Sequence, residues 1–171
     1  MDYNSPDELL AVVDSDDSEI GSETRSRIHR DGLLHRAVHV LVFDTAGNLI
    51  IQQRSTLKDT FPLHWECVGG HLSPGEAYSV AAVREVREEL GVEVSDLEFL
   101  CKIPASHATG LEFIGVFRAT AQGDPVPEPQ EIVDLARLSP DDLRAEIGAG
   151  ARMFSPVFVN TLRWAGLLPC A

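Results

Sequence analysis

Apolar and polar residues alternate along several short stretches of the chain, a pattern typical of β-strands. Between His35 and Asp44, three valines fall on one side and Leu41 and Phe43 on the other, which predicts a strand buried on both faces. The same criterion predicts strands or extended segments at Leu9–Val13, Glu19–Ser22, Leu49–Arg54, Trp65–Gly70, Val92–Ile103, Leu111–Ala121 and Ile132–Leu138. Asp14–Ser18 is rich in turn residues, so the first two strands are expected to form a hairpin.

Capping signals predict where the helices begin and end. Ser73, Pro74 and Glu76 supply a hydroxyl N-cap, a proline at the first helical position and a capping-box glutamate, and Gly91 supplies a left-handed end. The helix between them has a core-facing apolar stripe of Val80, Val83, Val86 and Leu90. Further helices are predicted at Glu23–Asp31, which Gly32 breaks, from Ser139 and Pro140, and from Ser155 and Pro156 to near Gly166.

Strands with interspersed helices indicate one α/β domain with a central mixed sheet between helices. A chain of 171 residues is long enough to give such a domain a substantial core. Residues 1–34 contain the acidic hairpin and the short helix. We expect them to form an N-terminal extension of a single domain that spans residues 1–171.

Three glutamates on the long predicted helix are the candidates for chemistry. Glu85, Glu88 and Glu89 are spaced i, i+3 and i+4, so they project from one side of a helix. Neighbouring carboxylates at this spacing repel one another by about 0.2–0.5 kcal/mol per pair. A solvated acidic face explains most such runs. A divalent cation such as Mg²⁺ or Mn²⁺ would relieve the repulsion, because these ions take carboxylate oxygens as ligands.

The charge balance narrows the choice of partners. The formal charge is −13, and the acidic residues from Asp2 to Glu23 all precede the first basic residue, Arg25. Binding to a nucleic-acid polymer needs clustered Lys and Arg, so no such partner is expected. No membrane partner is expected either, since no apolar run is long enough to span a bilayer and the acidic N-terminus does not resemble a targeting peptide. Three scattered cysteines, Cys67, Cys101 and Cys170, favour a reducing cytoplasmic location.

The stretch Gly70–Val92 resembles the Nudix box at every defined position of that motif. The matching residues are Gly70, Glu76, Arg84, Glu85, Val86, Glu88, Glu89, Gly91 and Val92. The resemblance implies a Nudix-type α/β/α sandwich and a hydrolase that uses Mg²⁺ or Mn²⁺. It implies that Glu85, Glu88 and Glu89 bind the metal, with the Gly70 carbonyl as a further ligand. Arg84 would orient a glutamate of the box, and Glu85 is alternatively the base that holds the attacking water.

Nudix proteins often use one more carboxylate from a later loop. Glu128 and Glu131 lie in the loop where such a residue would fall, and Glu112 is a third candidate. Each of these charges taken alone is more often solvent-facing. Glu131 is the preferred catalytic candidate of the three.

The segment Leu34–Glu76 also resembles type I isopentenyl diphosphate isomerase, itself a Nudix-fold enzyme. The shared residues are His35, Arg36, Ala37, Gln52, Gln53, Arg54, Lys58, Pro62, Trp65, Gly70, His71, Gly75 and Glu76. By this resemblance Arg54 and Lys58 grip the substrate diphosphate. His35 and His71 match metal ligands of the isomerase, and His29 is offset by one residue from another. A satisfied structural histidine is the simpler interpretation of each.

The resemblance to the isomerase fails at one position that matters for chemistry. The isomerase has a catalytic cysteine immediately before its Gly-His pair, where this chain has Gly69. The isomerase also lacks the full glutamate cluster. Both differences favour hydrolysis over allylic proton transfer.

We therefore expect a metal-dependent hydrolase that cleaves a diphosphate bond in a nucleoside diphosphate linked to another group, or in a related organic diphosphate. The alternatives are an isopentenyl diphosphate isomerase-like enzyme and a non-catalytic Nudix module that binds a nucleotide sugar. The partner is a small diphosphate molecule in each case. A homodimer is a reasonable expectation for the assembly, since dimers are common in families of this kind.

Overall fold

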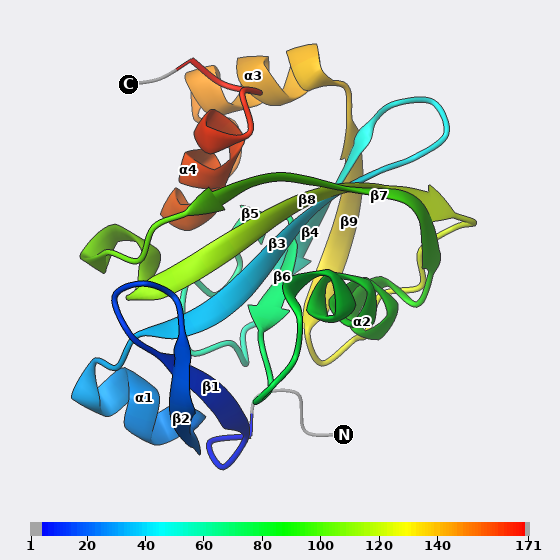
Figure 1. The fold of residues 1–171 in the computed structure, drawn as a ribbon. Coiled ribbons are helices and arrows are strands. Elements are labelled where there is room, and N and C mark those ends of the chain that lie inside the picture. The colour runs from blue at the N-terminus through cyan, green and yellow to red at the C-terminus, as the bar shows by residue number, and fades with distance from the viewer. Residues whose placement is uncertain (1–4, 170–171) are drawn as a thin grey trace.

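A mixed β-sheet of nine strands runs through the computed structural model, which describes residues 5–169 (Figure 1). The strands are β1 (Leu9–Val13), β2 (Glu19–Thr24), β3 (His35–Phe43), β4 (Leu49–Arg54), β5 (Trp65–Glu66), β6 (Val68–His71), β7 (Glu93–Ile103), β8 (Glu112–Gln122) and β9 (Ile132–Leu138). The helices are α1 (Arg25–Asp31), α2 (Tyr78–Leu90), α3 (Pro140–Ala149) and α4 (Pro156–Trp164). Asp2 and Cys170, which entered the charge and cysteine arguments, lie outside the described residues.

Strand β3 is the centre of the sheet. It pairs antiparallel with β1, β4 and β6 and parallel with β8. Strand β8 pairs in turn with β7, and β4 pairs with β5 and β9, all antiparallel. The pairing of β3 with β6 covers residues 37–40, whereas β3 meets β4 only where Phe43 faces Leu49. Strands β4 and β6 therefore pair with β3 at different positions along its length. Glu89 of α2 contacts both β4 and β6.

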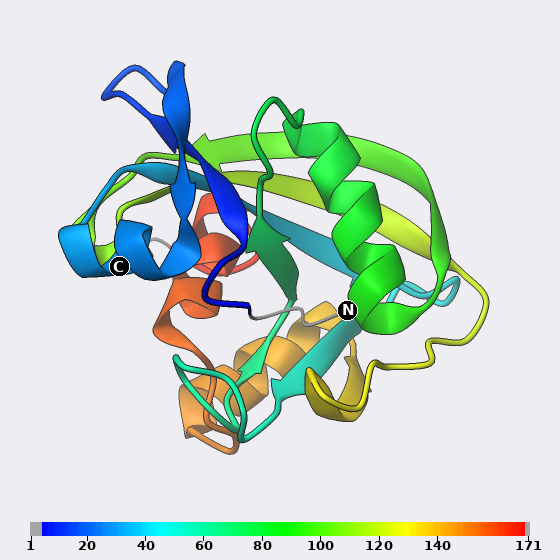
Figure 2. The ribbon, with the colours of Figure 1, turned by 90° about the horizontal axis from the view of Figure 1, so that it is seen from below.

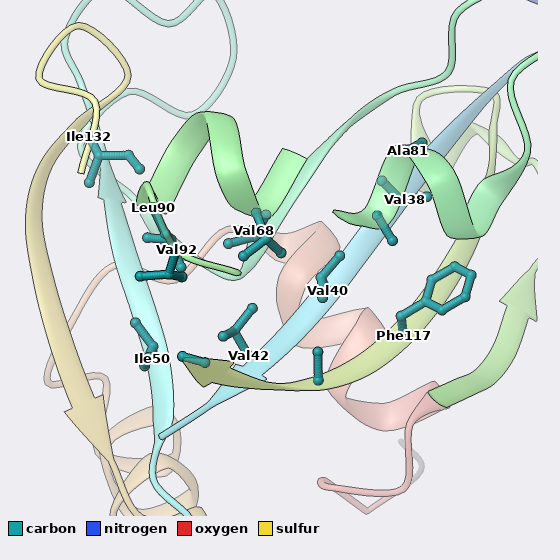
Figure 3. Close-up of a cluster of buried hydrophobic side chains, with 14 of the residues drawn as sticks. Val38, Val40, Val42, Ile50, Val68, Ala81, Leu90, Val92, Phe117 and Ile132 are labelled. Carbon is teal, nitrogen blue, oxygen red and sulfur yellow. The ribbon is translucent and has the colours of Figure 1, made fainter. Parts of the chain in front are cut away.

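Helices cover both faces of the sheet. Helix α2 lies on one face, and α3 and α4 lie on the other (Figures 1 and 2). Val38, Val40 and Val42 of β3 pack towards α2 in one apolar cluster (Figure 3). Leu41 and Phe43 belong to a second apolar cluster with residues of α3 and α4. Full burial stabilises each such side chain by roughly 1.5–3 kcal/mol. The predicted α/β/α sandwich with a central mixed sheet is confirmed.

The predicted strand limits agree with the structure to within a few residues, with one clear exception. Trp65–Gly70 is not a single strand, because β5 pairs with β4 whereas β6 pairs with β3. The chain changes neighbours at Cys67, which lies between the two strands. The second strand of the hairpin also extends to Thr24, so α1 begins at Arg25 rather than at Glu23.

The predicted start of the long helix at Ser73 and Pro74 is wrong, since α2 begins at Tyr78. Gly75 has a φ of 72°, a left-handed conformation that turns the chain before the helix. The Glu76 carboxylate accepts the Ser73 N–H at 3.0 Å, as a capping box requires, but it is also held by Arg84. Glu76 therefore fastens the turn to the middle of the helix. Gly91 ends α2 with a φ of 64°, as predicted.

The predicted apolar stripe of α2 is wrong at Val80, whose side chain is 58% exposed. Val83 is only half-buried. The residues that α2 buries are Ala81, Ala82, Glu85, Val86, Glu89 and Leu90. Glu85 and Glu89 therefore lie on the same inward side of α2 as its buried apolar residues.

The β1–β2 hairpin is fastened to the sheet by Asp17, at the hairpin turn. The Asp17 carboxylate accepts a hydrogen bond from Arg36 Nε at 2.7 Å and one from the Tyr78 hydroxyl at 3.1 Å, and it forms an ion pair with Lys102. Burial alone would raise the pKa of Asp17, but Arg36 and Lys102 hold it below its ordinary value. Because α1 follows β2 directly, these contacts also hold α1 beside the start of β3 (Figures 1 and 2).

Candidate active site

A cavity of about 810 Å³ lies along β3 and β6 and is bounded by residues of α1 and α2. Its wall contains most of the residues that the sequence proposed for the site. These residues are Arg54, Lys58, Gly70, Arg84, Glu85, Glu88, Glu89 and Glu131. Glu112 and His71 also line the cavity, whereas Glu128 does not. The fold therefore gathers side chains that are up to 77 positions apart, counting from Arg54 to Glu131.

Arg84 is the centre of a hydrogen-bond network on α2. Its Nε and Nη2 donate to the two oxygens of Glu76 at 2.8 and 2.9 Å, and Nη2 also donates to the carbonyl of His71 at 3.0 Å. Its Nη1 donates to Glu85 Oε1 at 2.7 Å and to Glu88 Oε2 at 3.1 Å. A guanidinium offers its donors in a rigid plane, so anchoring by Glu76 fixes the direction in which Arg84 presents Nη1 to both carboxylates.

Glu85 is buried against the backbone of Gly70. A Cβ atom at position 70 would lie 2.2 Å from the Glu85 carboxyl carbon, so only glycine allows the carboxylate this close to β6. Burial and then the neighbouring charge of Glu89 raise the pKa of Glu85 to about 8, against the opposing effect of Arg84. Without a cation, this carboxylate is in an unfavourable environment for its charge.

Glu89 lies between strands β4 and β6. Its Oε2 accepts hydrogen bonds from Gln52 Nε2 at 2.7 Å and from the Gly69 N–H at 3.2 Å. Burial raises the pKa of Glu89 even though Lys58, Gln52 and Gly69 act in the opposite direction. The two donors fix Oε2, so the second oxygen, Oε1, is the one left for a ligand.

Arg54 and Lys58 line the same cavity, and each is paired with a carboxylate. Arg54 forms an ion pair with Glu66, and Lys58 forms one with Glu131. Burial raises the pKa of Glu66 to about 7, although Arg54 opposes the shift. Burial lowers the pKa of Lys58. A phosphate group that enters the cavity would compete with Glu66 and Glu131 for these cations.

A second group of candidate metal ligands lies beside the carboxylates. His29, His35, His71 and Glu112 each place one ligand atom within 4.8 Å of the others. His71 Nε2 lies 3.1 Å from Glu112 Oε1, and His35 Nε2 lies 3.3 Å from the same atom. Burial and the neighbouring histidines lower the pKa of His29 to about 4. Burial alone would raise the pKa of Glu112, but hydrogen bonds from His35 and His71 hold it below its ordinary value.

Both groups suit divalent cations, though of different kinds. The carboxylates of α2 offer only oxygen ligands, which Mg²⁺ and Mn²⁺ prefer. Their burial and mutual repulsion, visible in the raised pKa values of Glu85 and Glu89, are what a cation would relieve. The histidine cluster offers imidazole nitrogens with one carboxylate, a set that suits a transition metal such as Mn²⁺ or Zn²⁺. Glu112 is therefore better placed as a ligand beside the histidines than beside α2.

The structure adds residues to which the sequence gave no role in the site. Glu66 and Gln52 are polar residues of strands in contact with the predicted site, and Arg25 lines the cavity from the first turn of α1. His39 also lines the cavity, from the middle of β3. One signal was available for His39, because it interrupts the otherwise apolar run from Ala37 to Phe43. No pattern in the sequence distinguishes Glu66 or Arg25 from a surface charge.

Comparison with known proteins agrees with this geometry. The NUDIX domain family matches residues 33–158 of the chain. An isopentenyl-diphosphate Delta-isomerase of Nocardia farcinica is 35% identical over 163 residues, covering 91% of this chain and 93% of the relative. A protein with the same name from Serratia proteamaculans is 36% identical over 129 residues, covering 70% of this chain and 72% of the relative.

Solved structures show the same architecture. The crystal structure of DR0079 from Deinococcus radiodurans has a TM-score of 0.75 and 30% identity, covering 91% of this chain and 98% of that one. A NUDIX hydrolase from Nitrosomonas europaea, at 20% identity and a TM-score of 0.60, covers 78% of this chain and 88% of its own, and shares the fold. The chain therefore belongs to the Nudix family, in the branch that resembles isopentenyl-diphosphate isomerase.

Proposed function

We propose that this protein is a metal-dependent hydrolase that cleaves a diphosphate bond in a nucleoside diphosphate linked to another group, or in a related organic diphosphate. The observation that carries the proposal is the carboxylate cluster of α2. Glu85 and Glu89 are buried beside one another, and Arg84 holds Glu85 and Glu88 in place. Burying carboxylates is costly unless a cation or a hydrogen-bond network compensates.

The residues of the chain divide the work as follows. Glu85, Glu88 and Glu89 would hold Mg²⁺ or Mn²⁺, with the Gly70 carbonyl as an additional oxygen. When bound, the metal supplies positive charge for the phosphoryl oxygens and lowers the pKa of water. Arg54 and Lys58 bind the diphosphate by exchanging their carboxylate partners for phosphate oxygens. In the alternative role, Glu85, whose pKa is raised by burial, would accept the proton of the attacking water at a carboxylate oxygen, and Glu88 and Glu89 would hold the metal.

Isomerisation of an isopentenyl-type diphosphate is the second candidate function. The comparisons taken alone favour it over hydrolysis, because the curated relatives cited above are named isomerases. The cluster of His29, His35, His71 and Glu112 supports it too, since His35 and His71 match metal ligands of that enzyme by resemblance.

The surroundings of Gly69 argue against the isomerase. The cysteine that the isomerase uses would stand at position 69, where a Cβ atom would lie 2.8 Å from His39 Cδ2 and 2.9 Å from the Val38 carbonyl oxygen. A side chain at this position would therefore displace the His39 ring or the backbone. A purely binding module, the third candidate, is disfavoured by a complete glutamate cluster.

A single comparison of activities tests the proposal. The purified protein is incubated with Mg²⁺ or Mn²⁺ and a panel of nucleotide-linked and isoprenoid diphosphates, while released phosphate or nucleotide and double-bond migration are both followed. We expect metal-dependent hydrolysis of at least one diphosphate and no isomerisation. Isomerisation without hydrolysis would establish the second candidate, and binding without turnover would establish the third.

Further proposals concern the location, domain organisation and assembly of the protein. Among residues 5–169, no helix combines the length and the apolar character needed to cross a bilayer. We propose that residues 1–171 work as one domain on a small diphosphate molecule in a reducing, cytoplasmic environment, and that the protein assembles as a homodimer. Sedimentation of the purified chain tests the assembly.

A further inference from the structure

His39 forms part of the cavity wall. It lies in the middle of β3, where it pairs with Gly69 of β6. Its ring covers Gly69 so closely that a Cβ atom at that position would lie 2.8 Å from Cδ2 and 3.4 Å from Nε2. The edge of the ring that carries Nε2 therefore lies over the β6 backbone at the point where Gly69 donates its N–H to Glu89.

Thr161 of α4 determines which nitrogen of His39 carries the proton. His39 Nδ1 lies 2.7 Å from Thr161 Oγ1, and Thr161 Oγ1 donates its own proton to the Val157 carbonyl at 3.0 Å. A hydroxyl has one proton to donate, so in the contact with His39 it must accept. Nδ1 therefore carries the hydrogen, and Nε2 presents a lone pair.

The imidazole is held in its neutral form. Burial lowers the pKa of His39 to about 4; the negative charge of Glu112 opposes this shift, whereas Arg54 and His71 act in the same direction as burial. Within residues 5–169, Nε2 has no hydrogen-bond partner in the protein, although His39 lines the cavity. A fixed acceptor without a partner in a ligand cavity favours ligands that bring a donor, because a ligand that buries it unpaired loses binding energy.

We propose that His39 Nε2 accepts a hydrogen bond from a hydroxyl group on the organic part of the substrate, and that this contact selects hydroxylated diphosphates over hydrocarbon diphosphates. The inference rests on the proposed function, because it assumes a diphosphate held between the carboxylates of α2 and the pair Arg54 and Lys58. Gly69 links the two halves of the site, since its N–H holds Glu89 while its α-carbon underlies the His39 ring. An organic group attached to the bound diphosphate would extend past Gly69 to meet His39.

Two substitutions of His39 separate its two nitrogens. Asparagine is short and places its polar atoms near the position of Nδ1, so His39→Asn keeps the contact with Thr161 and removes the acceptor in the cavity. Glutamine reaches the position of Nε2, so His39→Gln restores an acceptor there. Both variants are polar and of moderate size, and thermal melting verifies that each folds.

The measurement is kcat/KM for hydrolysis of a matched pair, uridine 5′-diphosphate and its 2′,3′-dideoxy analogue, with isopentenyl diphosphate as the hydrocarbon probe. We expect the wild-type protein to have its highest kcat/KM for uridine 5′-diphosphate. His39→Asn should lower kcat/KM for uridine 5′-diphosphate about tenfold or more. The kcat/KM values for the other two substrates should change by less than about twofold. His39→Gln should recover part of the loss. An equal change for all three substrates, or no change, overturns the inference. If the wild-type protein hydrolyses no diphosphate at all, the proposed function itself has failed.

Thr161 is tested as a positioning residue by a second matched pair. Thr161→Ser keeps the hydroxyl, whereas Thr161→Val removes it with little change in volume. We expect Thr161→Ser to retain the preference for uridine 5′-diphosphate and Thr161→Val to lose most of it. The ¹⁵N chemical shifts of the His39 ring provide a readout that packing alone would not move. They should show a protonated Nδ1 in the wild-type protein and in Thr161→Ser, and a protonated Nε2 in the wild-type protein would overturn the inference.

Discussion

At the residue scale, Glu88 differs from the other two glutamates of the cluster. Glu85 and Glu89 are buried, whereas Glu88 is half-buried and accepts a hydrogen bond from Arg84 Nη1, which also donates to Glu85. Glu88 therefore contributes less to folding than its neighbours. It is the best position at which to remove a carboxylate charge without disturbing the packing.

Glu88→Gln should abolish most of the hydrolysis and leave the fold intact. Glutamine keeps the volume and an oxygen for Arg84 but removes one negative charge from the proposed metal site. Loss of even an outer-shell partner of a metal lowers affinity or activity about 10–100-fold, so loss of a direct ligand should cost at least as much. Phosphate release and thermal melting measure the two effects. Glu93→Gln, which alters an exposed ion pair with Arg87, is the matched control and should behave like the wild-type protein. Turnover near the wild-type level in Glu88→Gln would remove Glu88 from the site.

Arg54→Ala and Lys58→Ala should each raise KM for diphosphate substrates more than they lower kcat. A charge-assisted hydrogen bond contributes about 1.5–3 kcal/mol, which corresponds to roughly a tenfold to hundredfold change in KM. Steady-state kinetics with the best substrate measures the change. Arg118→Ala is the control, because Arg118 stacks on Phe43 and does not line the cavity. Unchanged kinetics in both variants would mean that these cations serve only as partners of Glu66 and Glu131.

Helical spacing predicted the residues of the site that share one local element. Arg54, Lys58 and Glu131, which lie on separate segments, were predicted only through the family resemblance, and Glu66 and His39 were not predicted for the site. Glu85, Glu88 and Glu89 lie on one helix, so their spacing alone brings them together. Glu66 and His39 come from separate strands, and each enters the site only because β4, β5 and β6 pair as they do around β3. A side chain whose environment is made by distant segments looks, in one sequence, like any other polar residue.

At the scale of elements, one carboxylate gathers several polar contacts that hold the N-terminal hairpin to the sheet, in addition to the pairing of β1 with β3. Asp17 contacts Arg36, Tyr78 and Lys102, and Arg36 and Lys102 also lie over the ring of Tyr78 at 5.6 and 5.0 Å from its centre. Glu19 adds a hydrogen bond at 3.0 Å from the Gly75 N–H. These contacts connect the hairpin to β3, β7 and the turn before α2, and they fix α1, which supplies part of the cavity wall.

Asp17→Asn should destabilise the protein by about 1–3 kcal/mol at neutral pH, because it leaves Arg36 and Lys102 without their anionic partner. The folded pKa of Asp17 is lower than its ordinary value of 3.8, so its contribution is fully present above that pH and is lost as the pH falls through the folded pKa. The difference in unfolding free energy between the wild-type protein and Asp17→Asn should therefore shrink below about pH 4. Urea titrations at several pH values measure it.

The control for this prediction lies in the same turn. Asp16 is exposed, and its backbone N–H bonds to Asp14 without involving the Asp16 carboxylate. Asp16→Asn should leave the unfolding free energy nearly unchanged at every pH. An Asp17→Asn protein as stable as Asp16→Asn would show that the hairpin is held by packing alone.

The elements themselves were predicted with uneven success for a physical reason. Strand limits follow from local alternation, and helix ends at Gly91 and Gly32 follow from a left-handed residue, so both were predictable. The start of α2 was not, because Ser73, Pro74 and Glu76 carry the same signal whether they begin a helix or form a turn clasped by Arg84. Local sequence does not reveal which of the two the rest of the chain supports.

At the scale of the whole molecule, the proposed metal site would couple the stability of the fold to metal binding. Burial raises the pKa values of Glu85 and Glu89, so the metal-free fold carries acidic groups in an unfavourable environment. In the proposed function a metal ion compensates for this environment, so the metal-free protein should be the less stable form. Metal and stability should therefore be linked in a way that a surface cluster of glutamates would not show.

Mg²⁺ or Mn²⁺ should raise the melting temperature of the wild-type protein. A ligand at a hundred times its dissociation constant adds about 2.7 kcal/mol to the unfolding free energy, which corresponds to roughly 5–10 °C for a domain of this size. Glu85→Gln imitates the protonated carboxyl that burial favours, so in the presence of a chelator it should melt at or above the wild-type temperature. The same variant should lose most of the metal-induced rise in melting temperature, whereas Glu93→Gln should keep it.

A wild-type melting temperature that neither ion changes would show that the cluster binds no metal. A chelated Glu85→Gln protein that melts well below the wild-type protein would show that Glu85 is held by its contacts with Arg84 rather than reserved for a cation.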